Sequence, residues 1–225
     1  MRAKVNLPLN LTIGSQQLLE LKMNDLLDRK IQQMHAALAG LATDDLSTIK
    51  LQFGENDGCY YTSIDFNQDF DEIALANAVT LLITNIASIK DHLKVWCNKQ
   101  GVVFQGDALI NSNKAVALIH DLWNIDKHGE LNKPPRSGHT PKLQDLSKNL
   151  SISAGTAAGG GAFFSMDSRT GKITTGTSGG GSVQLALVAQ IVDENGNVLG
   201  DFTSICIQAV DKWAKALSSA GVQLP

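Results

Sequence analysis

The apolar residues between positions 73 and 96 recur at the spacing of one long α-helix. They form a single stripe: Ile73, Val79, Leu82, Ile83, Ile86, Ile89, Leu93 and Trp96. The pattern begins after Asp69 or Asp71, continues to about Asn98 and meets a stop signal at Gly101. A helix of this length spans about 45 Å, long enough to organise a helical bundle. Because polar residues such as Asn85 interrupt the stripe, we expect a buried helix and no membrane span.

Two other patterns precede this helix. Apolar residues at helical spacing follow Ser15, a good N-cap, and continue to Gly40, which predicts a first helix. Residues 47–66 then alternate apolar and polar side chains on either side of the turn sequence at 54–58. This change of period predicts a β-hairpin inserted between the two helices.

A third helix is predicted after Ser112 or Asn113. It ends near Leu131, because Pro134 and Pro135 cannot continue a helix. Residues 134–141, Pro-Pro-Arg-Ser-Gly-His-Thr-Pro, form a stiff, polar segment that we call the connector. It is the best domain boundary in the chain.

After the connector, short strand patterns alternate with glycine-rich stretches. The predicted strands are 150–153, 163–166, 173–175 and 183–192. Asn195-Gly196 is a strong signal for a tight hairpin turn. The acidic stretch 193–197 superficially resembles a calcium loop, but Val198 stands where such a loop needs glycine. A last amphipathic helix is predicted from Thr203 or Ser204.

These elements predict an α+β fold: an antiparallel helical bundle with an inserted β-hairpin, and a C-terminal β-rich region closed by a helix. We expect residues 1–133 to form the bundle, with the hairpin at about 47–66, and residues 142–225 to form the β-rich region plus the C-terminal helix, packed on the bundle as one unit.

The formal net charge of −3 excludes a strongly basic nucleic-acid-binding surface over the whole molecule. The N-terminus lacks a signal-peptide pattern and the three cysteines form no CxxC pair, so we expect a cytoplasmic protein without disulfides.

The densest polar cluster is Asn124-Ile125-Asp126-Lys127-His128. On a helix, Asp121, Asn124 and His128 share one face and Lys127 lies beside them. In a catalytic reading His128 acts as general acid or base, Asn124 orients it and Lys127 holds a phosphate. In the alternative reading Lys127 and His128 only satisfy the end of the helix and its dipole. Spacing alone favours the alternative.

A second polar cluster, with Asp91 and His92, lies on the long helix. If the two helices pack antiparallel, these residues approach Asn124 and His128. The predicted candidate catalytic residues are therefore His128, Asn124, Lys127, Asp91 and His92. Two histidines and a carboxylate can also hold a metal, but no Glu-x-x-His pair completes such a site. We therefore expect no metal and no cofactor.

Two short motifs carry a family resemblance. Lys90-Asp91-His92-Leu93, followed some thirty residues later by Leu122-Trp123-Asn124-Ile125-Asp126-Lys127-His128, resembles a group of uncharacterised bacterial proteins with a HEPN-like helical bundle. The resemblance covers about residues 70–135. This chain has Ile89-Lys90 where the group usually has Ala-Leu, and Gly129 where it usually has Arg.

The resemblance implies a homodimer with an RNA or protein partner, in a toxin or phage-defence setting. HEPN proteins that cut RNA use an Arg-x(4–6)-His motif. His128 matches its histidine, but no Arg stands upstream at that spacing, and Arg136 and Lys127 are the nearby cations. A ribonuclease needs a fixed cation where charge develops.

The second hypothesis is a non-catalytic, partner-binding bundle in which the polar motif is a buried hydrogen-bonding clasp. The third, a metalloenzyme, would use His92 and His128.

Overall fold

The computed structural model of the chain describes residues 15–43, 45–46, 49–56, 59–65, 72–155, 157–167, 169–170 and 172–223. The helices are α1 (Ser15–Ala39), α2 (Glu72–Gln100), α3 (Gly106–Ser112), α4 (Lys114–His128) and α5 (Phe202–Ala220). The strands are β1 (Ala42–Thr43), β2 (Lys50–Asn56), β3 (Cys59–Asp65), β4 (Lys142–Ser153), β5 (Gly161–Met166), β6 (Ile173–Ser178), β7 (Ser182–Val192) and β8 (Val198–Asp201).

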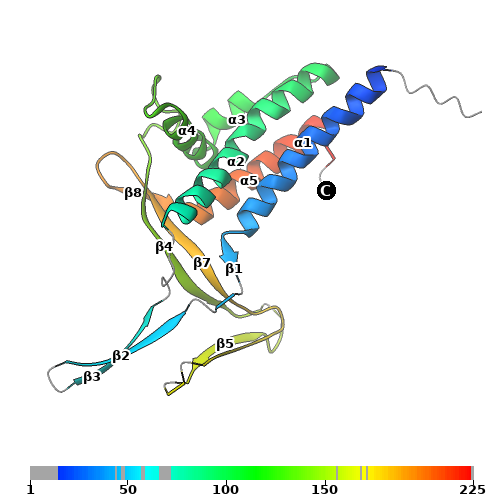
Figure 1. Cartoon of the computed structure of the whole chain (residues 1–225). Helices are drawn as coiled ribbons and strands as arrows, with labels where there is room; N and C mark the ends of the chain where they lie inside the picture. Colours follow the sequence, from blue (N-terminus) through cyan, green and yellow to red (C-terminus); the bar gives the residue numbers. More distant parts are fainter. Residues whose placement is uncertain are drawn as a thin grey trace, which may run out of the picture.

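The strands form antiparallel sheets, and β7 is the central strand of the largest one. In the largest sheet β7 pairs with β4 on one side, and with β1 and β8 on the other. Every second residue of β7 from Val183 to Ile191 is buried, so one face of this strand belongs to the core. Two further hairpins, β2–β3 and β5–β6, project from the end of this sheet that is remote from the helices (Figure 1).

α2 is the central helix of the core. It is the one helix in the described part of the chain that is long and apolar enough to cross a membrane, and 44% of that stretch is buried inside the protein. Leu82, Ile86 and Ile89 are fully buried. The predicted stripe is therefore buried from Val79 to Leu93, whereas Ile73 at its start is 73% exposed. Asn85, which interrupts the stripe, is also buried and accepts a 2.7 Å hydrogen bond from Lys30 Nζ of α1.

α5 is part of the same core. Asp201 caps its N-terminus by accepting a hydrogen bond from the Ser204 amide, at 2.7 Å. Its apolar face buries Phe202, Trp213 and Leu217, and the helix contacts α1, α2, α3, α4 and β7. In Figure 1 it lies alongside α1 and α2.

The predicted fold class is therefore wrong. The chain is not an antiparallel HEPN-like helical bundle followed by a β-rich region with a closing helix. α5 lies inside the helical layer, and the sheet takes β1 from the first half of the chain and β4, β7 and β8 from the second. One core cluster unites α1, α2, α4, β7 and α5. The reason for the error is physical: periodicity identifies which face of an element is apolar, but does not say which other element covers it.

The individual elements follow the sequence more closely. α1, α2, α5 and the β2–β3 hairpin agree with the predicted positions within a few residues, although parts of residues 47–66 lie outside the described residues. α4 ends at His128, before the predicted end at Leu131, because Gly129 takes a left-handed conformation with φ +76°. β4 begins at Lys142, eight positions earlier than predicted. α3 was missed because seven residues are too few to display an apolar stripe.

Candidate functional site

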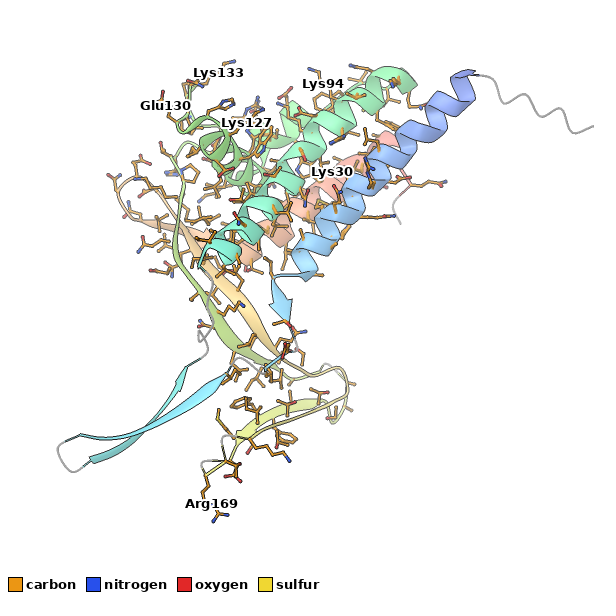
Figure 2. All side chains as sticks on the ribbon, viewed as in Figure 1. Lys30, Lys94, Lys127, Glu130, Lys133 and Arg169 are labelled. Carbon is orange, nitrogen blue, oxygen red and sulfur yellow. The ribbon has the colours of Figure 1, made fainter. Side chains whose placement is uncertain are left out.

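The polar motif of α4 lines a pocket of about 350 Å³ between α2, α4 and the connector. The lining side chains come from three segments: Lys90 and Asp91 of α2; His120, Asp121, Trp123, Asn124 and His128 of α4; and Arg136 with residues 130–134 after α4. We call this space the α4 pocket. Figure 2 shows Lys127, Glu130 and Lys133 gathered at this end of the helical layer.

Local sequence explains why α4 presents its polar groups here. The Asn113 side chain accepts a 3.1 Å hydrogen bond from the Val116 amide and starts the helix. Residues 115–122 are all buried, so the first two turns of α4 are fixed in the core. The later residues Asn124 and His128 are progressively more exposed. The pocket therefore forms where a core helix reaches the surface.

Asp121 joins α4 to the connector. Its Oδ1 accepts a hydrogen bond from the Arg136 amide at 3.2 Å, and its Oδ2 accepts one from the Ser137 amide at 2.8 Å. The side chain is only 2% exposed. A buried carboxylate is stable when amide donors satisfy both of its oxygens. We call this arrangement of Asp121, Arg136 and Ser137 the Asp121 clasp.

His120 and Asn124 form a second buried contact. One turn apart on α4, they place Asn124 Nδ2 2.9 Å from His120 Nδ1. Because the amide nitrogen can only donate, Nδ1 accepts and the imidazole proton is assigned to Nε2. Burial, followed by the charges of Lys90 and Arg136, lowers the pKa of His120 to about 4. His120 is therefore neutral at physiological pH.

Two of the cations that line the pocket are held by one carboxylate. Asp107 of α3 pairs with Lys90 of α2 at 3.0 Å and with Arg136 of the connector at 2.9 Å. Arg136 Nη1 also donates to Asn111 Oδ1 at 3.4 Å. The hydrogen bond from Lys90, assisted by that from Arg136, lowers the pKa of Asp107. These contacts connect α2, α3 and the connector.

The structure brings together three of the five predicted site residues. Asp91, Asn124 and His128 line the α4 pocket. Lys127 instead lies over the Trp123 ring, 5.0 Å from its centroid. His92 is not among the lining residues; burial, followed by the charge of Lys30 of α1, lowers its pKa. The arrangement therefore does not assemble His92 and His128 into the metal site considered above.

The pocket has no clear preference for anions. Its lining carries three positive side chains, Lys90, Lys133 and Arg136, and three negative ones, Asp91, Asp121 and Glu130. Asp107 supplies a further negative charge beside two of the cations. A phosphate would have to compete with this carboxylate for both Lys90 and Arg136. Chemically, the site is best suited to holding its own segments together.

Sequence reasoning missed His120 and Asp107. A signal for His120 was present, since it lies four residues before Asn124 and the two must meet on a helix. Asp107 lies on α3, a helix that was not predicted, so its position beside Lys90 and Arg136 was inaccessible from the sequence.

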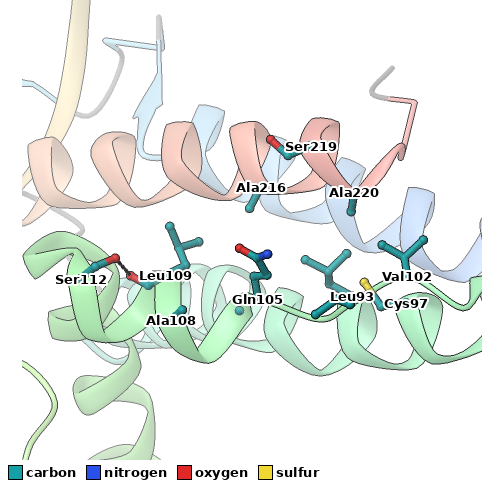
Figure 3. A pocket seen from close by; sticks show the side chains of 12 residues that line it. Leu93, Cys97, Val102, Gln105, Ala108, Leu109, Ser112, Ala216, Ser219 and Ala220 are labelled. Atoms are coloured by element: carbon teal, nitrogen blue, oxygen red, sulfur yellow. Dashed lines mark hydrogen bonds between the residues drawn. The ribbon is translucent and has the colours of Figure 1, made fainter.

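A second cavity, of about 450 Å³, lies between α2, α3 and α5 (Figure 3). Its wall is mostly aliphatic, with Cys97 and Gln105 among the exceptions. Two hydroxyl groups face it, but Ser112 Oγ already donates to Leu109 O and Ser219 Oγ to Lys215 O. Burial raises the pKa of the Cys97 thiol, which makes it a poor nucleophile. None of the predicted site residues lines this cavity.

Comparisons of the chain with protein-family models, with curated proteins and with solved structures find no match.

Proposed function

We propose that the chain is a non-catalytic, partner-binding protein in which the polar motif of α4 is a hydrogen-bonding clasp. The observation that carries this proposal is the Asp121 clasp, in which both carboxylate oxygens accept connector amides. Removing one partner from such a buried, charge-assisted contact leaves the other unsatisfied, at a cost of about 1–3 kcal/mol. The Asp121 carboxylate is therefore engaged in structure and is not free to act on a substrate.

The clasp fixes the path by which the chain leaves the helices and enters the sheet. The connector leads directly into β4, which pairs with β7 along ten residue positions and continues towards the projecting β5–β6 hairpin. Apolar side chains are exposed on this part of the molecule, with Ile152 at 50% and Phe163 at 54% exposure. Exposed apolar side chains on projecting strands favour a protein partner.

His120 is poorly suited to proton transfer. His120 is buried, neutral and bonded to Asn124. His128 occupies the exposed last turn of α4 together with Lys127. A general acid or base at neutral pH should have a pKa near 7, and the pKa of His120 is about 4.

The proposal is tested by comparing the stability of three variants. Asp121→Asn is expected to lower the free energy of unfolding by about 1–3 kcal/mol, whereas Asp126→Asn, an exposed change on the same helix, should stay within about 0.5 kcal/mol. His128→Ala should resemble Asp126→Asn. Urea unfolding followed by circular dichroism measures all three. The clasp proposal fails if Asp121→Asn is as stable as Asp126→Asn.

Phosphate-directed chemistry on RNA, as a homodimer in a toxin or defence setting, is the second candidate. It is favoured by one observation: Arg136 and Lys90 lie in the same pocket as His128. This proposal expects the purified chain to cleave RNA, and expects His128→Ala and Arg136→Gln to abolish cleavage. RNA that stays intact with the unmodified chain contradicts it and supports the non-catalytic function.

A further inference from the structure

A separate group of ligating side chains lies where the connector passes the turn between β7 and β8. It consists of His139, Asp193 and Glu194, and one nitrogen or oxygen of each lies within 4.8 Å of the others. The imidazole comes from the connector and the two carboxylates from the residues after β7. The fold itself therefore creates the group, because these two segments are far apart in the sequence.

Hydrogen bonds hold Asp193 rigidly. Its Oδ1 accepts from the amides of Asn195 and Asn197, at 2.9 and 2.8 Å, and its Oδ2 accepts from Asn197 Nδ2 at 2.8 Å. Each carboxylate oxygen has about two lone pairs, so Oδ2 retains one. The side chain is 6% exposed, which leaves this remaining lone pair with little competition from bulk water.

Glu194 and His139 are positioned by the same backbone segment. Glu194 Oε2 accepts a 3.0 Å hydrogen bond from the amide of Thr140, the residue next to His139. Ser137 Oγ accepts from the His139 amide at 3.4 Å and donates to the His139 carbonyl at 3.0 Å. The part of the connector that is bonded to Asp121 therefore leads directly to His139.

Lys and Arg side chains make no ion pair with the two carboxylates in the described part of the chain. Among the described residues, both ion pairs made by Lys or Arg involve Asp107, so neither Asp193 nor Glu194 has such a partner there.

We propose that His139, Asp193 and Glu194 bind a divalent transition-metal ion that ties the connector to the β7–β8 turn. One imidazole nitrogen and two carboxylate oxygens form a mixed ligand set that suits Zn²⁺ or Mn²⁺ better than Ca²⁺ or Mg²⁺, which prefer oxygen alone. Three protein ligands leave at least one position for water. This site could not be predicted from the sequence, because the β7–β8 turn alone lacks the pattern of a calcium loop and the third ligand, His139, lies in the connector.

The test uses the full chain after treatment with a chelator and dialysis. Zn²⁺, Mn²⁺, Ca²⁺ and Mg²⁺ are titrated separately by calorimetry, and melting is followed with and without each ion. The ligand variants are His139→Gln and Glu194→Gln, which alter partly or fully exposed side chains. His128→Gln, at an exposed histidine outside the group, is the matched control for non-specific zinc binding.

We expect one equivalent of Zn²⁺ to bind and to raise the melting temperature, since an ion that binds only the folded state stabilises it. Each ligand variant should melt like the unmodified chain without metal, and should bind Zn²⁺ more than about tenfold more weakly. The control should retain full binding. The proposal is overturned if the unmodified chain binds no Zn²⁺, if His139→Gln retains its affinity, or if Ca²⁺ binds more tightly and independently of His139.

Discussion

The amide of Ser137 donates a 2.8 Å hydrogen bond to Oδ2 of Asp121, joining two positions 16 residues apart. Together with the bond from the Arg136 amide, it anchors the connector to a helix whose first turns lie in the core. The segment after α4 is therefore held by its backbone, independently of the identities of most connector side chains. These two hydrogen bonds should therefore protect the connector from cleavage by a protease.

Asp121→Asn is expected to make the Arg136–Ser137 peptide bond sensitive to trypsin. The amide side chain of asparagine keeps one acceptor oxygen but presents its NH₂ group to the other connector amide. Cleavage of a transiently open segment follows the population of the open form. Limited proteolysis with mass spectrometry measures the effect, and Lys133 is an internal reference because the following Pro134 blocks trypsin. Equal cleavage rates in the unmodified chain and the variant would contradict the expectation.

The stability of the protein should fall as pH is lowered from about 6.5 to 4. The unfolded chain binds a proton at His120 near its ordinary pKa of 6.5, whereas the folded chain resists protonation down to about 4. The unfolded state therefore gains protons first, and the free energy of unfolding decreases by up to about 3 kcal/mol across this window. At pH above 6.5 both states are neutral at this position and the contribution is constant.

Urea unfolding at a series of pH values measures this slope. His120→Gln should remove most of it, because glutamine does not titrate. His92 also has a lowered pKa and contributes in the same direction, so His92→Gln serves as the comparison. An unchanged slope in His120→Gln would show that the imidazole is not buried as described.

Gly129→Arg is expected to destabilise the protein by about 1 kcal/mol. Gly129 closes α4 in the left-handed region at φ +76°, and its amide donates to the Ile125 carbonyl. An L-residue other than glycine is strained there, and asparagine is tolerated better. Thermal melting of Gly129→Arg and Gly129→Asn should therefore rank the asparagine variant as more stable. A stabilising arginine would mean that α4 continues past His128 in solution.

Trp213→Ala is expected to cost about 3–5 kcal/mol. Trp213 is 1% exposed and lies on the face of α5 that packs in the helical core. A helix that merely closed the β-rich region would tolerate the change better. Val198→Ala, at a side chain that is 61% exposed on β8, is the control and should stay within about 0.5 kcal/mol. If Trp213→Ala does not fold, the volume-conserving Leu217→Met should still give a folded protein with a cost below about 1.5 kcal/mol.

Local sequence predicted most of the longer elements, but not α3, and it did not predict which elements pack together. The apolar stripe of α2, the N-terminal signal of α4 and the Asn195-Gly196 turn all identify structures that depend on nearby residues. The pairing of β1 with β7, and the packing of α5 among the other helices, depend on contacts between distant segments. No periodicity encodes such contacts, which is why the predicted fold class failed.

The same distinction applies to the α4 pocket. Asp91 and His92 were both expected there, but consecutive residues on a helix are about 100° apart, and only Asp91 lines the pocket. Lys127 is displaced from His128 for the same reason and lies over Trp123. Contacts within α4 could be predicted from residue spacing, whereas the hydrogen bonds from the connector amides to Asp121 could not.

The pairing of Ala42 in β1 with Ala186 in β7 also has a consequence for biosynthesis. During synthesis β1 emerges well before β7, the strand that pairs with it, and α1 likewise emerges well before α5. The native core therefore cannot be completed until residues 182–220 have left the ribosome. A translation product that stops before residue 182 leaves β1 without its partner strand and leaves uncovered the surfaces that α5 packs against, where chaperones and proteases can bind them.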